Sequence, residues 1–302
     1  MNQVEFSFLI TTKNRLTELI KTLDRLSFLL TDNRVEFIIC DDGSTDGTSN
    51  FITTHYPNIH LINNIKSRGL IYSRNRLLSS TKTPYAITLD DDAHLVSKDI
   101  LEQINSHFNT HITCAVIAFR IFWGKVLPEK TDHFHTKTRV KGFVGCGHVW
   151  RMEAWRSIPN YPDWFIFYGE EDFASYHLFK AGWEVHYVPN ILVHHRVDIN
   201  SRKRDKDYRI RLRRSLRSGW YLYVVFYPLK TIPRRFLYTI WVQLKTKVFK
   251  GDVYAFIAIL QALGDLVIKF PRLLKMANRL SKKEFVEYSK LANTRVYWEL
   301  DG

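Results

Sequence analysis

The fold is decided by the stretch Tyr85-Ala86-Ile87-Thr88-Leu89-Asp90-Asp91-Asp92, an apolar run that ends in three consecutive aspartates. A short apolar run bounded by a turn is typical of a buried strand. A second run, Val35–Cys40, leads in the same way into Asp41-Asp42-Gly43-Ser44. Ligands of open α/β sheets gather at the carboxyl ends of the strands, so both acidic turns are expected at one edge of a sheet.

Around these two runs, β-rich apolar segments alternate with helix-like segments over the first ~115 residues, which is the pattern of βαβ units. The pattern predicts an α/β fold whose open, mainly parallel sheet is flanked by helices. The segment Arg120–Gly147 is a weaker mixture of loop and strand that could line a site. The expected strands are Val4–Thr11, Val35–Cys40, Ile59–Ile62, Tyr85–Leu89, Cys114–Ile121, Val185–Val188 and Ile191–His195, and the expected helices are Leu16–Leu30, Thr48–His55, Leu70–Ser79, Ile100–Phe108 and Phe173–Gly182.

The excess positive charge of the chain lies in its last third. The 302 residues carry a net charge of +14. Residues 196–302 hold 24 Lys and Arg against 9 Asp and Glu, whereas residues 1–195 hold 20 against 21. We therefore predict an α/β domain over residues 1–200 and a basic, amphipathic helical extension over residues 201–302, with the change of composition marked by Arg202-Lys203-Arg204.

The extension has three possible roles. Its basic and aromatic residues suit an anionic membrane surface. A plain helical appendage and a nucleic-acid-binding surface are the alternatives, although no nucleic-acid-binding motif is recognisable, so no nucleic-acid partner is expected. No run reaches the ~20 apolar residues of a spanning helix, because Gln261 and Asp265 interrupt the best candidate.

Two further features favour a cytoplasmic location. The N-terminal residues lack the basic and then apolar pattern of a signal peptide, with Glu5 at an unfavourable position. The chain has three cysteines, Cys40, Cys114 and Cys146, at spacings that match neither a disulfide framework nor a zinc site. We expect them to be reduced thiols that mostly fill the core.

The three aspartates Asp90–Asp92 suggest a metal. Adjacent carboxylates raise one another's pKa unless a cation neutralises them, and oxygen ligands suit Mg2+ or Mn2+, which bridge a protein carboxylate to a diphosphate. The alternative is an exposed acidic turn that caps a helix beginning near Asp99. Asp41–Asp46 could likewise be a strand-ending turn, or it could present a carboxylate to a base or a ribose hydroxyl.

A second acidic cluster, Glu170-Glu171-Asp172, precedes a helical segment. Acids at a helix start gain ~0.3–1 kcal/mol from the helix dipole, but three are more than a cap requires, and one could act as a general base. In the pair His194-His195, strand alternation sends the two side chains to opposite faces, and we expect His195 to reach the metal. Arg74 could contact a phosphate or lie on a helix surface.

These motifs, taken in order, resemble the glycosyltransferases of family 2, which have the GT-A fold. The resemblance covers about residues 4–200 and rests on five motifs: Phe8–Arg15, Cys40–Asp46, Arg74-Asn75, Asp90–Asp92 and Gly169–Asp172. It implies an open α/β sheet that binds a nucleotide-diphosphate sugar and an enzyme that inverts the anomeric centre.

The resemblance also implies roles for the residues on the donor side. Thr11 and Asp42 would contact the nucleobase, and Arg74 would lie near the donor phosphates. Asp90 and Asp91 would border the ribose and the sugar. Lys13 stands where many members of the family have an aromatic residue that stacks on the base.

The remaining matched residues would carry the metal and the catalytic proton. Asp92 would hold the metal, and His195 matches a histidine that completes the metal shell in some members. Asp172 matches the catalytic base, with Glu171 beside it on the acceptor side.

The sequence therefore predicts an inverting, metal-dependent glycosyltransferase that uses Mn2+ or Mg2+. It would move a sugar from a nucleotide-diphosphate donor to a hydroxyl of a glycan or lipid-linked acceptor, in cell-surface polysaccharide synthesis at the inner face of the cell membrane. Two alternatives stay open. One is a non-catalytic protein that binds sugar nucleotides or nucleic acid on the same fold. The other is a nucleotidyltransferase, which would usually show a glycine-rich phosphate loop after the first strand.

Overall fold

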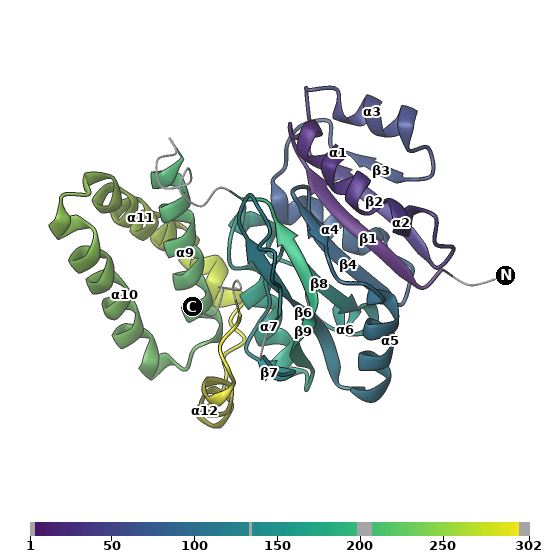
Figure 1. Cartoon of the computed structure of the whole chain (residues 1–302). Helices are drawn as coiled ribbons and strands as arrows, with labels where there is room; N and C mark the ends of the chain where they lie inside the picture. The colour runs from purple at the N-terminus through teal and green to yellow at the C-terminus, as the bar shows by residue number, and fades with distance from the viewer. Residues whose placement is uncertain (1–3, 133–134, 198–206, 296–302) are drawn as a thin grey trace.

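The structure, a computed structural model, describes residues 4–132, 135–197 and 207–295 (Figure 1). Within these residues nine strands form one sheet in the order β3-β2-β1-β4-β8-β6-β9-β5, with β7 paired to β9. The strands are β1 Phe6–Thr12, β2 Val35–Asp41, β3 His60–Asn63, β4 Tyr85–Asp90, β5 Ala93–Leu95, β6 Cys114–Trp123, β7 Thr138–Val140, β8 Gly147–Arg151 and β9 Glu184–His195.

Helices cover both faces of this sheet and continue beyond it. Apolar side chains of α1, α2 and α5 pack with those of Phe6, Phe8 and Ile10 on one face. Residues of α4, α6 and α7 pack on the opposite face, where Leu9 lies. The helices are α1 Leu16–Arg25, α2 Ser27–Leu30, α3 Thr48–His55, α4 Leu70–Ser80, α5 Ile100–Thr110, α6 Met152–Arg156, α7 Glu170–Lys180, α9 Tyr208–Phe226, α10 Ile232–Thr246, α11 Val253–Lys275 and α12 Lys282–Lys290.

The predicted elements agree with the structure to within a few residues, with three differences. The single helix expected over Leu16–Leu30 is two helices that meet at Leu26. The two late strands are one continuous strand, β9, whose pairing with β6 shifts after Phe119. The short strands β5, β7 and β8 were not expected, and β8 lies antiparallel between β4 and β6 in the middle of the sheet.

The extension shares a core with the α/β part. Tyr221, Val225 and Phe226 of α9 belong to the same buried cluster as Phe165 and Phe173. A smaller cluster joins α9, α10 and α11 to one another. The predicted division of the chain at residue 200, with the basic run Arg202-Lys203-Arg204, lies outside the described residues and remains a prediction.

Helix α11 differs from the expectation for this region. By length and composition it could cross a membrane, and most of it is exposed. Gln261 and Asp265, which we expected to interrupt any apolar segment, lie inside the helix. Asp265 accepts two hydrogen bonds from Arg213 of α9 and a third from Arg217, so the neighbouring helix satisfies its charge.

Candidate active site

The two acidic turns meet at one edge of the sheet, as predicted. Strands β1, β2 and β4 are parallel, with Thr11 opposite both Cys40 and Asp90. The residues that follow β2 and β4 therefore leave the sheet at the same level. This edge is the expected ligand-binding edge of an open α/β sheet.

The three aspartates at the end of β4 are not an exposed turn. Asp91 and Asp92 are only 6% and 5% exposed. Asp91 accepts a hydrogen bond from Thr12 Oγ1 at 2.9 Å and pairs with Arg15 Nε at 3.0 Å. Arg15 also reaches Asp92, with 2.6 Å between Nη2 and Oδ2. Burial with specific partners excludes the helix-capping alternative for these two carboxylates.

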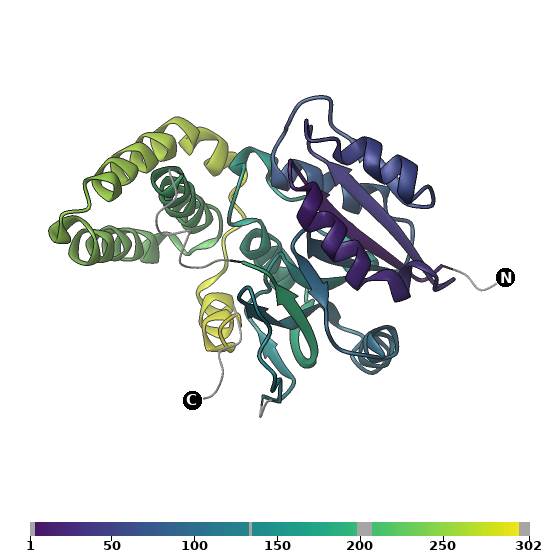
Figure 2. The same cartoon turned by 45° about the horizontal axis from the view of Figure 1, so that its top comes forward.

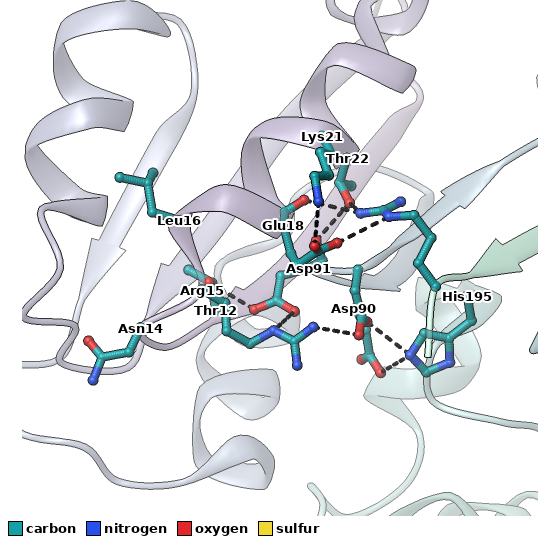
Figure 3. A network of polar contacts seen from close by, with 12 residues as sticks. Thr12, Asn14, Arg15, Leu16, Glu18, Lys21, Thr22, Asp90, Asp91 and His195 are labelled. Atoms are coloured by element: carbon teal, nitrogen blue, oxygen red, sulfur yellow. Dashed lines mark hydrogen bonds and ion pairs between the residues drawn. The ribbon is translucent and has the colours of Figure 1, made fainter. Parts of the chain in front are cut away.

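His195 approaches the aspartates from the end of β9, on a different side from Arg15 (Figure 3). Its Nε2 atom lies 2.9 Å from Asp92 Oδ1 and 3.9 Å from Asp90 Oδ2. His194 lies on the opposite face of the strand, where its Nε2 atom is 2.8 Å from the carbonyl oxygen of Gly124. The alternation that we used to choose between the two histidines is therefore present in the structure.

The charges in this cluster follow from these contacts. Burial disfavours the carboxylate of Asp92, but its contacts with His195 and Arg15 outweigh burial and lower the pKa of Asp92 to about 2. Burial, opposed by Arg15, raises the pKa of Asp91 to about 7. Burial disfavours the imidazolium of His195, but Cys146 and Asp92 raise the pKa of this histidine to about 10. Asp92 therefore stays ionised and faces a group that carries positive charge.

The donor atoms around His195 fit a divalent metal ion. One ligand atom each from Asp90, Cys146 and His195 lies within 4.8 Å of the other two, and Asp92 is in contact with His195. The Asp90 side chain remains 28% exposed, so the cluster opens to the outside. Carboxylate oxygens with one imidazole suit Mg2+ or Mn2+, and a cation here would take over the neutralising role of the imidazolium proton.

Arg74 joins the two acidic clusters. Its guanidinium is buried, with Nη2 at 3.0 Å from Asp90 Oδ1. Its Nη1 atom lies 2.8 Å from Glu170 Oε1 and 3.1 Å from Glu171 Oε1. The aspartates after β4 and the acids of α7 therefore border one site, separated by a single side chain. Of the two roles considered for Arg74, placement on an exposed helix surface is excluded.

The loop before β8 lies directly over this arginine. A Cβ atom on Gly145 would be 2.3 Å from Glu171 Oε1 and 2.4 Å from both terminal nitrogens of Arg74. Only glycine lets the backbone approach so closely. The next residue, Cys146, places its thiol beside His195, so this part of the Arg120–Gly147 segment does line the site.

The acids of α7 occupy the first turn of the helix. Asp172 reaches solvent, yet the protein around it and the charge of Glu171 raise the pKa of Asp172 to about 6. Glu170 is buried, and burial together with the charge of Glu171 raises its pKa. Asp172 is thus a carboxylate that can both face a ligand and exchange a proton near neutral pH.

The extension holds the loop in front of these acids. Ile166 and Tyr168 have positive φ angles of 69° and 71°, an uncommon conformation for residues other than glycine. Arg217 of α9 donates a hydrogen bond of 2.6 Å to the carbonyl oxygen of Phe165, just before them. The position of the α7 acids therefore depends on a helix from the C-terminal third.

Thr11 and Asp42, predicted to contact the nucleobase, both lie buried at the same edge of the sheet. Each carboxylate oxygen of Asp42 accepts two hydrogen bonds from the loop that follows β3. Burial opposes ionisation of Asp42, but these bonds outweigh it and lower the pKa. The four donors are Asn64 Nδ2, Ser67 Oγ and the backbone N–H groups of Arg68 and Gly69.

Three residues of the site were given no role from the sequence. Arg15 was part of a quoted motif, and three carboxylates in need of a cation are the signal that could have identified it. Cys146 was assigned to the core, and nothing in its spacing indicates that it contacts His195. Gly145 lies too close to Arg74 for any other residue, which only the folded chain reveals.

Among proteins of known structure, this architecture is that of the GT-A glycosyltransferases. Three solved structures that are similar to this chain are GalNAc-T7 with UDP, GalNAc and Mn2+, TarS of S. aureus, and the mannosyltransferase PcManGT from Pyrobaculum calidifontis with GDP-Man and Mn2+. Their TM-scores are 0.58, 0.53 and 0.54, at 15%, 14% and 13% identity. They cover 74%, 69% and 96% of this chain, and 48%, 38% and 84% of their own chains.

The sequence match is more specific than the shared fold. The profile described as "Glycosyl transferase family 2" matches residues 7–171, and the chain belongs to this family. The O-antigen chain rhamnosyltransferase WbaN of Salmonella anatum is 23% identical over 201 residues. The match covers 59% of this chain and 62% of that relative, so the chain spans less than two thirds of its length.

Proposed function

We propose that this protein is an inverting glycosyltransferase that moves a sugar from a nucleotide-diphosphate donor to a hydroxyl of a glycan or lipid-linked acceptor. The observation that carries the proposal is the bridge of Arg74 between Asp90 and the α7 acids, which brings a cation-binding cluster and a proton acceptor to one site. Family membership and the O-antigen relative support synthesis of a cell-surface polysaccharide as its context.

The donor side would be held by the β4 cluster. Asp92 and His195 would bind a divalent ion, Mn2+ or Mg2+, with Asp90 facing the donor. Bound there, the ion would act as a Lewis acid that offsets the charge developing on the leaving diphosphate. GalNAc-T7 and PcManGT were both solved with Mn2+, which supports a divalent ion here as well.

The acceptor side would be served by α7. Asp172 accepts the proton of the acceptor hydroxyl, whose oxygen forms a bond to the anomeric carbon of the sugar. The bond from that carbon to the diphosphate oxygen breaks at the same time, and the nucleoside diphosphate leaves with the electron pair. Attack from the side opposite the diphosphate inverts the anomeric centre. A base with a pKa of about 6 is largely ionised at pH 7, as this step requires.

The test is release of nucleotide from a panel of nucleoside-diphosphate sugars, with Mn2+ or Mg2+ and with EDTA as control. The proposal predicts release for at least one donor, dependent on the metal and lost in Asp172→Asn. Donor binding with no release, even with glycan and lipid-linked acceptors present, would support the non-catalytic sugar-nucleotide-binding alternative instead.

We further propose that the extension places the enzyme on the inner face of the cell membrane. Helices α10 and α11 lie at the end of the molecule farthest from the N-terminal strands (Figures 1 and 2). Both carry apolar side chains that are 45–73% exposed, with basic side chains around them. The apolar residues are Leu237, Tyr238, Trp241, Val253, Tyr254, Phe256, Leu260, Val267, Ile268 and Leu274, and the basic ones are Arg234, Arg235, Lys245, Lys269, Arg272 and Lys275.

This combination suits a membrane interface better than open water. Large exposed apolar patches are uncommon on soluble monomers. An amphipathic helix can bury its apolar face at the boundary of headgroups and acyl chains, while each basic residue near an anionic surface contributes about 1 kcal/mol. Because α11 packs on α9 through Ala255, Ala258 and Ala262, we place the helix along the surface and not across the bilayer.

Vesicle sedimentation tests this location. The protein should sediment with anionic vesicles at low salt and less so at high salt, and the double variant Trp241→Ser with Leu260→Ser should stay in the supernatant. Ile112→Ser, an exposed apolar residue of the α/β part, is the matched control. Wild-type protein that stays soluble with anionic vesicles at low salt, or forms a stable dimer that the double variant abolishes, would contradict the membrane assignment.

A further inference from the structure

Three histidines gather at the end of the sheet opposite to the acidic site. His107 lies in the last turn of α5, His111 directly follows that helix, and His186 lies near the start of β9. One ring nitrogen of each lies within 4.8 Å of the other two. His195 ends the same strand, and at ~3.3 Å per residue it lies roughly 25–30 Å from His186. The cluster is therefore separate from the proposed active site.

A carboxylate fixes the orientation and tautomer of His186. Glu184 Oε2 lies 2.8 Å from His186 Nε2, and a carboxylate can only accept, so Nε2 carries the proton. The other oxygen of Glu184 pairs with Arg139 Nη1 at 2.8 Å, which holds the carboxylate in place. In the neutral ring, Nδ1 of His186 then presents a lone pair toward His107. A histidine that donates one ring N–H to a carboxylate and offers the lone pair of its other ring nitrogen is typical of metal sites.

The two rings that face each other are arranged for a shared ion. His107 Nε2 and His186 Nδ1 are 3.0 Å apart and share a hydrogen bond, and this distance is also close to the ~3.3 Å between two nitrogens that each lie ~2.0 Å from a tetrahedral ion. His107 Nδ1 is buried and has no hydrogen-bond partner among the described residues. Burial lowers the pKa of His107 to about 3 and also lowers that of His186, so both rings are neutral at pH 7.

His111 supplies the third ring at the rim of this cluster. It is exposed and stacks on His107, with ring centroids 4.2 Å apart. The stacking brings the two rings to one side of the helix end, as in the pairs of histidines four residues apart that chelate metals on helices. Its exposure leaves a path for an ion to enter and room for water as a fourth ligand.

We propose that His107, His111 and His186 form a zinc-binding site, with Glu184 as the group that orients His186. Three imidazoles and a water make a tetrahedral set that zinc accepts, whereas Mg2+ and Mn2+ prefer oxygen. The ion would tie the end of α5 to the start of β9, two segments that are far apart in the sequence. The role of the ion is structural: it stabilises the end of the sheet opposite to the acidic site and takes no part in sugar transfer.

Zinc content and cobalt spectroscopy of untagged, EDTA-treated and desalted protein test the proposal. When zinc is added back to this metal-free protein, we expect one Zn2+ per chain to bind tightly, equally so in Asp92→Asn, and Co2+ in its place to give the visible absorption bands of tetrahedral geometry. Zinc should raise the Tm by about 3 °C or more when it saturates the site. His111→Gln should weaken zinc binding at least about 100-fold, and Glu184→Gln about 10–100-fold.

Because His111 is exposed, His111→Gln should fold even if a variant at buried His107 does not. His55→Gln removes an exposed histidine of α3 and is the matched control, with zinc binding unchanged. Zinc affinity and cobalt spectra that are the same in His111→Gln and His186→Gln as in the wild type would overturn the proposal. Loss of tight zinc binding in Asp92→Asn alone would overturn it too, because the ion would then belong to the acidic site.

Discussion

The two acidic clusters of this protein differ in how much freedom their carboxylates have. Asp92 is buried and held by Arg15 and His195, whereas Asp172 reaches solvent and has no ion-pair partner among the described residues. Their pKa values differ accordingly: that of Asp92 is lowered to about 2 and that of Asp172 is raised to about 6. A carboxylate of the first kind is suited to hold a cation and one of the second kind to move a proton.

The largest effect should come from removing the proton acceptor. Asp172→Asn keeps the size of the side chain but cannot take a proton, so we expect turnover to fall about 10³-fold while donor binding changes little. Initial rates and calorimetric titration of the donor measure the two quantities. If turnover were unchanged, the base would have to be another residue, and the assignment of proton transfer to the α7 cluster would be wrong.

Replacing the cation-binding carboxylate should have a smaller and different effect. Asp92→Asn removes the charge that faces His195, and we expect a fall of about 10²-fold in turnover at limiting Mn2+, partly restored by excess metal. Metal titration of activity measures this dependence. A variant with the metal dependence of the wild type would show that the ion does not lie on Asp92.

The contact of Arg74 with the two acidic clusters can be disturbed by a substitution in the loop before β8. In Gly145→Ala the new methyl group would overlap Arg74 and Glu171, so we expect a loss of activity of roughly tenfold or more with a Tm close to that of the wild type. Gly264→Ala is the matched control, since nothing lies within 4 Å of its Cβ position. Equal activity of the two alanine variants would mean that the bridge through Arg74 is not needed.

The smallest effect is the dependence of the wild type on pH. Protonated Asp172 cannot accept a proton, so kcat/KM should rise with pH and level off above about 6. This rise can be measured between pH 4.5 and 8 at saturating metal. A Tm recorded at each pH distinguishes loss of activity by protonation of Asp172 from loss by unfolding. If kcat/KM instead reached half of its maximum near the ordinary aspartate pKa of about 4, the surroundings of Asp172 would not raise its pKa.

The sequence predicted the elements that are strongly patterned. Strands β1, β2, β4 and β6 are apolar runs whose composition identifies them without tertiary information. Strand β8 has only five residues of mixed character, and its place between β4 and β6 is set by pairing partners far away in the chain. The prediction of a mainly parallel sheet therefore described the first half of the fold better than the second.

The site residues likewise divide into those that local sequence predicts and those that only tertiary contacts reveal. Acidic runs at strand ends could be assigned to one edge from topology alone, and alternation separated His195 from His194. The partners of these residues could not be found in this way, because Arg15, Arg74 and Cys146 meet the carboxylates only through the folded chain. The sequence also did not predict that Arg217 holds the loop before the α7 acids. The basic charge of the extension indicated a surface-binding role and not a contact with the site.

The most direct test of the account is a structure of Asp172→Asn with Mn2+ and an intact donor sugar. We predict that the metal bridges Asp92 and the diphosphate, with His195 beside it, and that residue 172 faces the anomeric carbon from the side opposite the leaving group. A donor whose anomeric carbon lies away from the α7 acids, or whose diphosphate binds without contact to the β4 cluster, would contradict it.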